Sequence, residues 1–463
     1  MLFNTIQFFV FLAVVLAGFY ASPPGWRKWL LLVASYFFYG CWNWRFIPFL
    51  LILTAIDYTA GLWITRTRPS RKKAVLIASL SANLIFLGFF KYYNFLASSV
   101  AWTLGMPLDA FALAIVLPVG ISFHTLQSMS YVVDVYRGEE KAVTNPLDYA
   151  LFICFFPQLV AGPIVRARYF FRDLFNWKPP TGEHISEGIL MVTLGLTKKM
   201  AFADQFAKIA DAYFRNTASQ PGMLTAWCGS AAFAIQVYFD FSGYTDIAIG
   251  CAKMLGFHFP VNFRRPFLAF STGDLWHRWH ITLSTWLRDY VYIALGGNRG
   301  GELKTYRNLF LTMLAGGLWH GANWNYVLWG GYNGVLLAVE RFLRGGKPEG
   351  KPRWFLYPFQ CALTIGLFVV GLAMFRAQGV RDGLHVISEM FTGAPGTLLF
   401  KPWHLGLAGM ALMIAAAEEK TKWFDWVVRG PRWAYASAMA MMLLCLELFA
   451  VTDIAIPFVY FQF

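Results

Sequence analysis

Two of the eight histidines lie in settings suited to chemistry. Histidine is the side chain best suited to act as an acid or base near neutral pH. His320 stands within residues 316–324, GGLWHGANW, an apolar and glycine-rich stretch. Ionisable residues inside long apolar segments are costly, and their default interpretation is functional. His320 is therefore a candidate general base, and the flanking glycines would let a substrate approach closely. A neutral histidine bonded to a backbone carbonyl explains its position equally well.

His280 is the second candidate, because it lies at the edge of an apolar helical face where its ring can turn inward. His277 lies three residues away, a spacing that a metal pair can use. No carboxylate or cysteine nearby completes a ligand set, so we expect no metal and interpret His277 as an interfacial polar residue. We interpret His124 as a hydrogen-bonded core residue.

Asp240 and Asp246 interrupt another long apolar run. One interpretation makes them proton-relay or substrate-orienting groups. The other pairs them structurally with arginines, and the spacing slightly favours this second role. The candidate arginines are Arg264, Arg265 and Arg278.

The elements that position these residues must lie in a membrane. The chain has 463 residues, of which 57% are hydrophobic and only 14% are charged, whereas soluble domains carry about 25% charged residues. Aromatic residues reach 18%, and the mean hydropathy is +0.49. These values predict a polytopic membrane protein.

The net charge of +14 is explained by basic cytoplasmic loops, so we do not expect nucleic-acid binding. The basic cluster in residues 66–73 places that loop in the cytoplasm and the N-terminus outside. The six cysteines form no CxxC motif or evident disulfide framework, and we interpret them as small buried hydrophobic residues.

Apolar runs recur along the whole chain, and their lengths approach the roughly 20 residues of a transmembrane helix. A shorter run near 405–417 is expected to dip into the membrane rather than cross it. The expected spans are 2–21, 29–44, 46–65, 74–93, 98–120, 147–165, 187–205, 223–239, 240–256, 308–325, 326–343, 356–375 and 433–452.

Two segments depart from this pattern. Residues 257–307 are more polar, and a tryptophan-rich apolar face recurs there at spacings of three and four, which predicts one amphipathic helix lying in the cytoplasmic membrane interface. Residues 308–343 are expected to line an internal cavity, because six glycines interrupt the long uncharged run that carries His320. The members of the tryptophan-rich face are Trp276, Trp279, Leu283, Trp286, Leu287 and Tyr290.

Several motifs together have an order and spacing that resemble the membrane-bound O-acyltransferase family, in its bacterial branch that acetylates alginate. The resemblance covers essentially the whole chain. Its motifs are residues 117–123 (LPVGISF), 156–164 (FPQLVAGPI), 239–244 (FDFSGY), 278–284 (RWHITLS), 287–290 (LRDY), 317–322 (GLWHGA) and 457–463 (PFVYFQF).

The resemblance implies a single all-α membrane domain over residues 1–463, with about 11–13 transmembrane or re-entrant helices around a central funnel. It implies that His320 matches the essential intramembrane histidine of the family and His280 its second polar active-site residue. The residues expected to support them or to bind substrate are Trp279, Asn323, Trp319, Asp240, Ser284 and Arg288. The sequence departs from the family pattern at His124, where an aromatic residue is common, and at Asn333, where a histidine is common.

The activity implied is acyl transfer, with acetyl as the expected group. No bound cofactor is expected; acetyl-CoA or another acyl thioester, or an acyl carrier, would be the cytoplasmic donor. The expected setting is the lipid bilayer of a bacterial inner membrane, beside periplasmic acetyl-transfer proteins and a polysaccharide synthase and secretion complex. D-alanyl transfer to teichoic acid is the alternative within the family. A proton-coupled transporter and a membrane scaffold for secretion are the alternatives from other classes.

Overall fold

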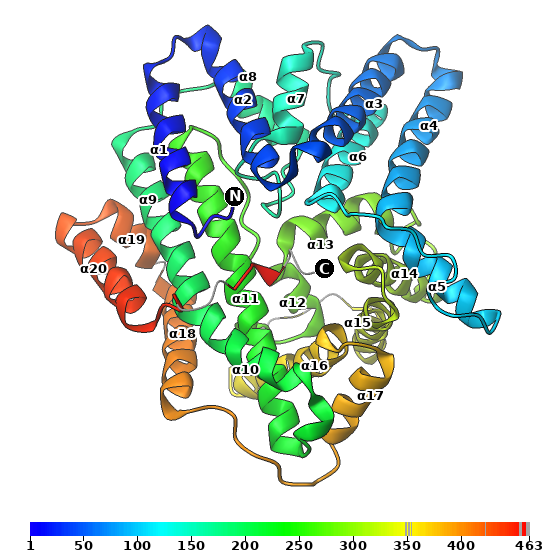
Figure 1. The fold of residues 1–463 in the computed structure, drawn as a ribbon, viewed down its shortest axis with the longest axis vertical. Helices are drawn as coiled ribbons and strands as arrows, with labels where there is room; N and C mark the ends of the chain where they lie inside the picture. Colours follow the sequence, from blue (N-terminus) through cyan, green and yellow to red (C-terminus); the bar gives the residue numbers. More distant parts are fainter. Residues whose placement is uncertain (348–349, 351, 353, 422, 453–455, 460–463) are drawn as a thin grey trace. The chain divides into compact units, whose positions relative to one another are not determined.

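The computed structural model describes residues 1–347, 350, 352, 354–421, 423–452 and 456–459. Over these residues the protein is all-helical and contains no strand, as predicted (Figure 1). The last four residues of the C-terminal motif, 460–463, lie outside the described residues. The chain divides into two compact units, which are Met1–Val192 with Thr245–Pro260, and Thr193–Tyr244 with Val261–Phe463.

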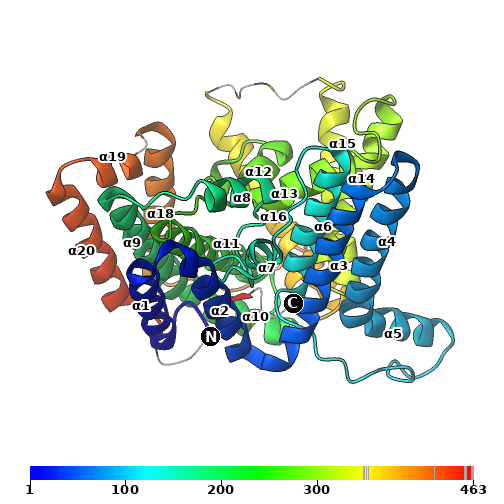
Figure 2. The same cartoon turned by 90° about the horizontal axis from the view of Figure 1, so that it is seen from above.

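The first unit contains the N-terminal helices, and α3, α4 and α6 pack side by side within it (Figures 1 and 2). Helix α9 begins in this unit and continues into the second through a π-helical turn, Thr197–Ala203. The helices are α1 (Ile6–Ala21), α2 (Pro24–Asn43), α3 (Ile47–Arg66), α4 (Pro69–Leu87), α5 (Tyr93–Thr103), α6 (Ile121–Arg137), α7 (Pro146–Cys154), α8 (Ala167–Phe175) and α9 (Gly182–Leu196).

A buried carboxyl group joins four helices of this unit. Asp57 of α3 accepts hydrogen bonds from Asn83 of α4 at 2.8 Å, from Ser79 of α4 and from Ser128 of α6. The Ser128 hydroxyl is 3.0 Å from the hydroxyl of Tyr149 of α7. A polar group away from water needs such partners, so this cluster fixes how the four helices pack.

The second unit carries both candidate histidines. Helix α11 is long, and its last turns belong to the first unit. The helices are α10 (Asp204–Arg215), α11 (Met223–Met254), α12 (Thr272–Arg278), α13 (Ile281–Leu287), α14 (Glu302–His320), α15 (Trp324–Leu343), α16 (Tyr357–Arg376), α17 (Val380–Glu389), α18 (Pro402–Thr421), α19 (Trp423–Arg429) and α20 (Arg432–Phe449).

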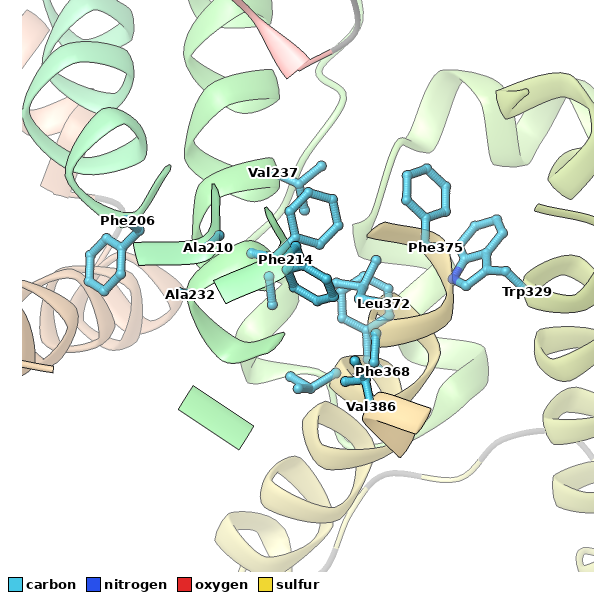
Figure 3. Packing of buried hydrophobic residues seen from close by; sticks show 14 of the residues in the cluster. Phe206, Ala210, Phe214, Ala232, Val237, Trp329, Phe368, Leu372, Phe375 and Val386 are labelled. Carbon is cyan, nitrogen blue, oxygen red and sulfur yellow. The ribbon is translucent and has the colours of Figure 1, made fainter. Parts of the chain in front are cut away.

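The core of the second unit is built from apolar side chains of α10, α11, α15, α16 and α17. Figure 3 shows Phe214 and Val237 beside Leu372, with Phe375 and Trp329 next to each other at one edge. The rings of Phe375 and Trp329 are 5.1 Å apart between centroids and meet nearly edge-on. This edge of the core is where His320 lies.

Four helical stretches of the described chain are long and apolar enough to cross a membrane. One of them, Pro24–Arg66, contains α2 and α3 in succession. The others are Pro69–Thr103, Tyr357–Arg376 and Arg432–Phe449, and the apolar helix Ile6–Ala21 is shorter. The exposed basic residues expected in the cytoplasm lie at the junction of α3 and α4.

Four expected spans differ from the structure. The span 98–120 is wrong, because α5 ends at Thr103 and residues 104–120 form no helix, with Pro107 and Pro118 in the segment. The span 147–165 is also wrong, since α7 ends at Cys154, shortly before Pro157. The separate spans 223–239 and 240–256 are one continuous helix, α11, because the polar residues in its middle are bonded within the protein rather than marking a boundary.

Candidate active site

The candidate general base ends a tightly packed helical hairpin. His320 is the last residue of α14, and α15 begins at Trp324 after a short turn. Figures 1 and 2 show the two helices side by side. A Cβ atom added at Gly330 would lie 2.6 Å from the Met313 carbonyl oxygen, and one at Gly317 would lie 2.9 Å from the Gly330 Cα. Gly317 and Gly330 therefore let the two helices pack closely.

Aromatic rings surround the His320 imidazole. Its centroid is 5.0 Å from that of Trp319, 5.2 Å from that of Trp329 and 5.3 Å from that of Phe375, all in edge-to-face geometry. Figure 3 shows two of these rings, Trp329 and Phe375. The His320 side chain is buried, with 8% of the residue exposed. Such apolar walls exclude water and strengthen electrostatic interactions inside them.

His280 occupies a break between two short helices. The single amphipathic helix predicted here is wrong: α12 ends at Arg278, α13 begins at Ile281, and His280 has a φ of +41°. A residue in the left-handed region cannot continue a right-handed helix. Asn262 satisfies the first two N–H donors of α13, because its backbone oxygen accepts from the Ile281 N–H at 2.9 Å and its side-chain oxygen from the Thr282 N–H at 3.2 Å.

The tryptophan-rich face packs on protein and does not form the lipid-facing surface that the sequence predicted. Trp279 and Trp286 are buried. The Trp279 ring lies 4.9 Å from that of Phe368 and 5.1 Å from that of Phe263. Trp279, the residue before His280, thus belongs to the core of the second unit, and Trp276 packs against that core.

The structure brings the two candidate histidines together. The centroids of the His280 and His320 rings are 6.4 Å apart, and His280 also meets Trp319 at 5.6 Å and Phe241 of α11 at 4.7 Å. Burial holds the pKa of the His280 imidazole well below its ordinary value, and the neighbouring His320 adds to the effect. His280 is therefore neutral at neutral pH and offers one ring nitrogen as donor and one as acceptor.

Three of the expected supporting residues make local contacts. Asn323 is exposed, and its side-chain oxygen accepts from the Asn325 N–H at 3.2 Å as the N-cap of α15. The Ser284 hydroxyl donates to the Trp279 carbonyl at 3.1 Å. Arg288 is exposed and donates to Asp289 at 2.8 Å. These contacts cap and brace helices, while Trp319 contacts both histidine rings and Trp279 belongs to the core of the second unit.

Asp240 is paired, but its partner is not one of the expected arginines. Its carboxylate lies 2.7 Å from the Lys199 ammonium. Arg265 instead pairs with Glu419 at 2.6 Å, and Arg278 pairs with Asp274 at 2.8 Å. His124 is buried with its ring nitrogen against the Leu159 carbonyl, as predicted, and His277 is exposed.

Lys199 and Phe241 are the residues that the sequence interpretation missed. A signal for Lys199 was present, because an ionisable residue inside an expected span demands a partner. No such signal was present for Phe241, since nothing in the sequence relates this residue to His280. Across the described residues, no group of three or more His, Cys, Asp or Glu side chains is arranged to hold a metal ion.

Comparison with known proteins places these features in a family. Residues 75–349 match the membrane-bound O-acyltransferase family. The chain is 44% identical to a Pseudomonas putida protein named "Probable alginate O-acetylase AlgI" and 38% identical to the Helicobacter pylori peptidoglycan O-acetyltransferase; each alignment covers 84% of this chain and 80% of the relative. It is 28% identical to the Streptococcus thermophilus teichoic acid D-alanyltransferase over 51% of this chain and 60% of that protein. The chain therefore belongs to the membrane-bound O-acyltransferase family and is a membrane-bound acyltransferase.

Proposed function

We propose that this protein transfers an acetyl group from a cytoplasmic thioester, with acetyl-CoA as the expected donor, toward hydroxyls of an exported polysaccharide or a periplasmic acetyl-handling partner. The observation that carries the proposal is the meeting of His280 and His320 inside aromatic walls, 6.4 Å apart. In a buried pair of imidazoles, one ring can accept a proton and the other can donate a hydrogen bond to a developing negative charge, without a metal.

In the proposed reaction His320 is the general base. It takes the proton of the acceptor hydroxyl as the oxygen attacks the thioester carbonyl carbon. The new C–O bond forms, the C–S bond breaks, and the proton passes from His320 to the leaving thiolate. General-base catalysis of this kind contributes about 10²–10⁴-fold to the rate.

His280 has the complementary role in this proposal. As a neutral imidazole it donates one N–H toward the thioester carbonyl oxygen, where negative charge develops in the transition state. Its neutrality is supported by its burial and lowered pKa. Trp319, which contacts both rings, and Trp329, which contacts His320, keep water away from the reacting groups.

The transferred group is proposed to be acetyl rather than D-alanyl, because the chain is more similar to O-acetylases than to a D-alanyltransferase. Two relatives with O-acetylase or O-acetyltransferase names align over 80% of their length, whereas the D-alanyltransferase aligns over 60% of its own length at lower identity. These similarities also support a bacterial, polysaccharide-related setting. The proposed partners there are a polysaccharide synthase and periplasmic acetyl-transfer proteins.

The proposed location is the inner membrane, with the N-terminus in the periplasm. This orientation is supported by the exposed basic residues between α3 and α4, because positive charge collects in cytoplasmic loops. Cysteine labelling from outside intact cells would test it: a cysteine placed at Thr5 should react, and one placed at Arg68 should not.

The deciding experiment measures ester-linked acetate on exported polysaccharide in cells that carry wild-type protein or His320→Ala at matched membrane abundance. Loss of acetate with unchanged polymer export supports the acyltransferase proposal. Normal acetylation in the variant would remove His320 from the mechanism and favour a scaffold. Consumption of acetyl-CoA by the wild type but not the variant, measured in membranes, separates transfer from a transporter role.

A further inference from the structure

A buried lysine in the second unit lies between two carboxylates that the proposed reaction does not use. The Lys199 ammonium is 2.7 Å from Asp240 and 2.8 Å from Asp204, and the Lys199 side chain has no exposed surface. Buried ion pairs are often no more stabilising than apolar side chains of the same volume. Stability alone therefore does not explain why the charges are here.

A segment near the end of the chain docks on this cluster. We call residues 457–459 the strap. The Val459 N–H donates to the second carboxylate oxygen of Asp240 at 2.8 Å, and Lys199 donates to the Pro457 carbonyl at 3.4 Å. The Phe458 ring lies under the ammonium, 4.6 Å from nitrogen to centroid. Phe458 and Val459 are buried, so the strap is part of the core.

The backbone around Lys199 is held close to α11. Lys199 lies in the π-helical turn Thr197–Ala203, a form that is rare and frequent at functional sites. A Cβ atom added at Gly243 of α11 would lie 2.6 Å from the Gly195 carbonyl oxygen and 3.2 Å from the backbone nitrogen of Lys199. The absence of a side chain at Gly243 thus lets the two backbones touch one turn from Asp240.

Helix α11 connects this cluster to the histidine pair. Successive residues of a helix point about 100° apart, so Asp240 faces Lys199 while Phe241 faces another side. The Phe241 ring meets His280 at 4.7 Å with an interplanar angle of 83°, and it meets Phe263 at 5.3 Å. Any rotation or sliding of α11 that frees Asp240 also moves the ring that supports His280.

We propose that Asp240 and Lys199, closed by the strap, are positioning residues that fix α11 so that Phe241 holds the His280 ring toward His320. This inference rests on the proposed acyl transfer and extends it to residues that do not touch the reacting atoms. Misplacing a catalytic group by about 1 Å can lower a rate by about 10². Loss of the strap contact should accordingly reduce turnover without weakening donor binding.

The test compares variants that differ in one hydrogen bond. Val459→Pro removes the N–H that donates to Asp240, whereas the matched control Val459→Ala shortens the side chain and keeps that N–H. Asp240→Asn is the second variant, since its amide oxygen still accepts from Val459 but no longer pairs with Lys199. The purified full-length proteins are assayed for acetyl transfer from acetyl-CoA, with kcat expressed per folded molecule after size-exclusion chromatography in detergent.

The expected result is a fall in kcat of about tenfold or more for Val459→Pro and Asp240→Asn, with KM for acetyl-CoA within about twofold of wild type. Val459→Ala should stay within about twofold in both constants. A purely structural role would lower yield and thermal midpoint but leave kcat per folded molecule unchanged, and that result overturns the proposal. If Val459→Pro yields no folded protein, the kcat per folded molecule of Asp240→Asn decides between the positioning role and a purely structural role.

A parallel assay of His320→Ala separates this inference from the proposed function. An inactive His320→Ala protein together with fully active strap variants contradicts the positioning role alone. Acetyl transfer that survives in His320→Ala, or its absence from the wild type, contradicts the proposed function instead.

Discussion

The imidazole of His280 lies 6.4 Å from that of His320, between ring centroids, although the first stands in a break between two helices and the second at the end of another. In the proposed reaction this spacing leaves room for two oxygens, each at a hydrogen-bonding distance of about 2.8 Å from one ring. The acceptor hydroxyl oxygen would lie against His320, and the thioester carbonyl oxygen against His280. The histidine pair and the helices that hold it lead to four predictions.

Replacing His320 by alanine should lower kcat for acetyl transfer by about 10²–10⁴-fold and leave KM for acetyl-CoA nearly unchanged, because the general base acts in the transition state. Steady-state kinetics on purified protein measures both constants. His277→Ala is the matched control, since His277 is exposed and on the neighbouring helix, and it should behave as wild type. Equal losses in the two variants would contradict the assignment.

The left-handed backbone at His280 predicts an unusual order among substitutions. Asparagine and glycine tolerate a positive φ, whereas a β-branched residue there is strained by about 1–2 kcal/mol. His280→Gly should therefore fold like wild type yet turn over slowly, and His280→Val should lose thermal stability as well. Unfolding midpoints in detergent check the order, and a His280→Val protein as stable as His280→Gly would disprove the strain argument.

Acid should destabilise the protein partly through His280. Its folded-state pKa lies below the unfolded value of about 6.5, so below that pH the unfolded chain binds the proton more readily and stability falls. Between about pH 7.5 and pH 5.5 the wild-type midpoint should drop further than that of His280→Asn, which cannot titrate. Parallel pH dependence in the two proteins would show that His280 makes no contribution.

Packing of the α14–α15 hairpin should be sensitive to a single methyl group. Gly330→Ala places Cβ against the Met313 carbonyl, a backbone atom that cannot swing away, and overpacking of this kind costs about 1–3 kcal/mol. We expect a lower unfolding midpoint and reduced turnover, since His320 ends the same hairpin. Gly366→Ala is the control, because nothing lies within 4 Å of its added Cβ, and it should be neutral or slightly stabilising.

Much of the site could be predicted from the sequence. His320 stands out because an ionisable side chain in an uncharged, glycine-rich run requires an explanation. The helices on either side of it could also be predicted, since the expected spans 308–325 and 326–343 overlap α14 and α15. The packing role of the glycines could not be predicted, because Gly317 and Gly330 meet only when α14 and α15 pack against each other.

The break at His280 could not be predicted from periodicity. The tryptophan pattern continues at helical spacing across it, while the cause of the break is a distant residue, Asn262, that caps the next helix. The sequence slightly favours a paired Asp240 over a proton-relay or substrate-orienting one, but the partner depends on which helix packs against α11. Lys199 comes from a segment remote in sequence, so local pattern alone does not select it over Arg278.

The position of His320 as the final residue of α14 has an electrostatic consequence for the reaction. The aligned peptide dipoles of a helix place about half a negative charge at its C-terminal end, and a cation there gains about 0.3–1 kcal/mol or more when partly buried. In the proposed reaction His320 accepts the hydroxyl proton, and the resulting imidazolium would form at that negative end. The helix that positions the proposed base would thus also stabilise the charge that catalysis creates on it.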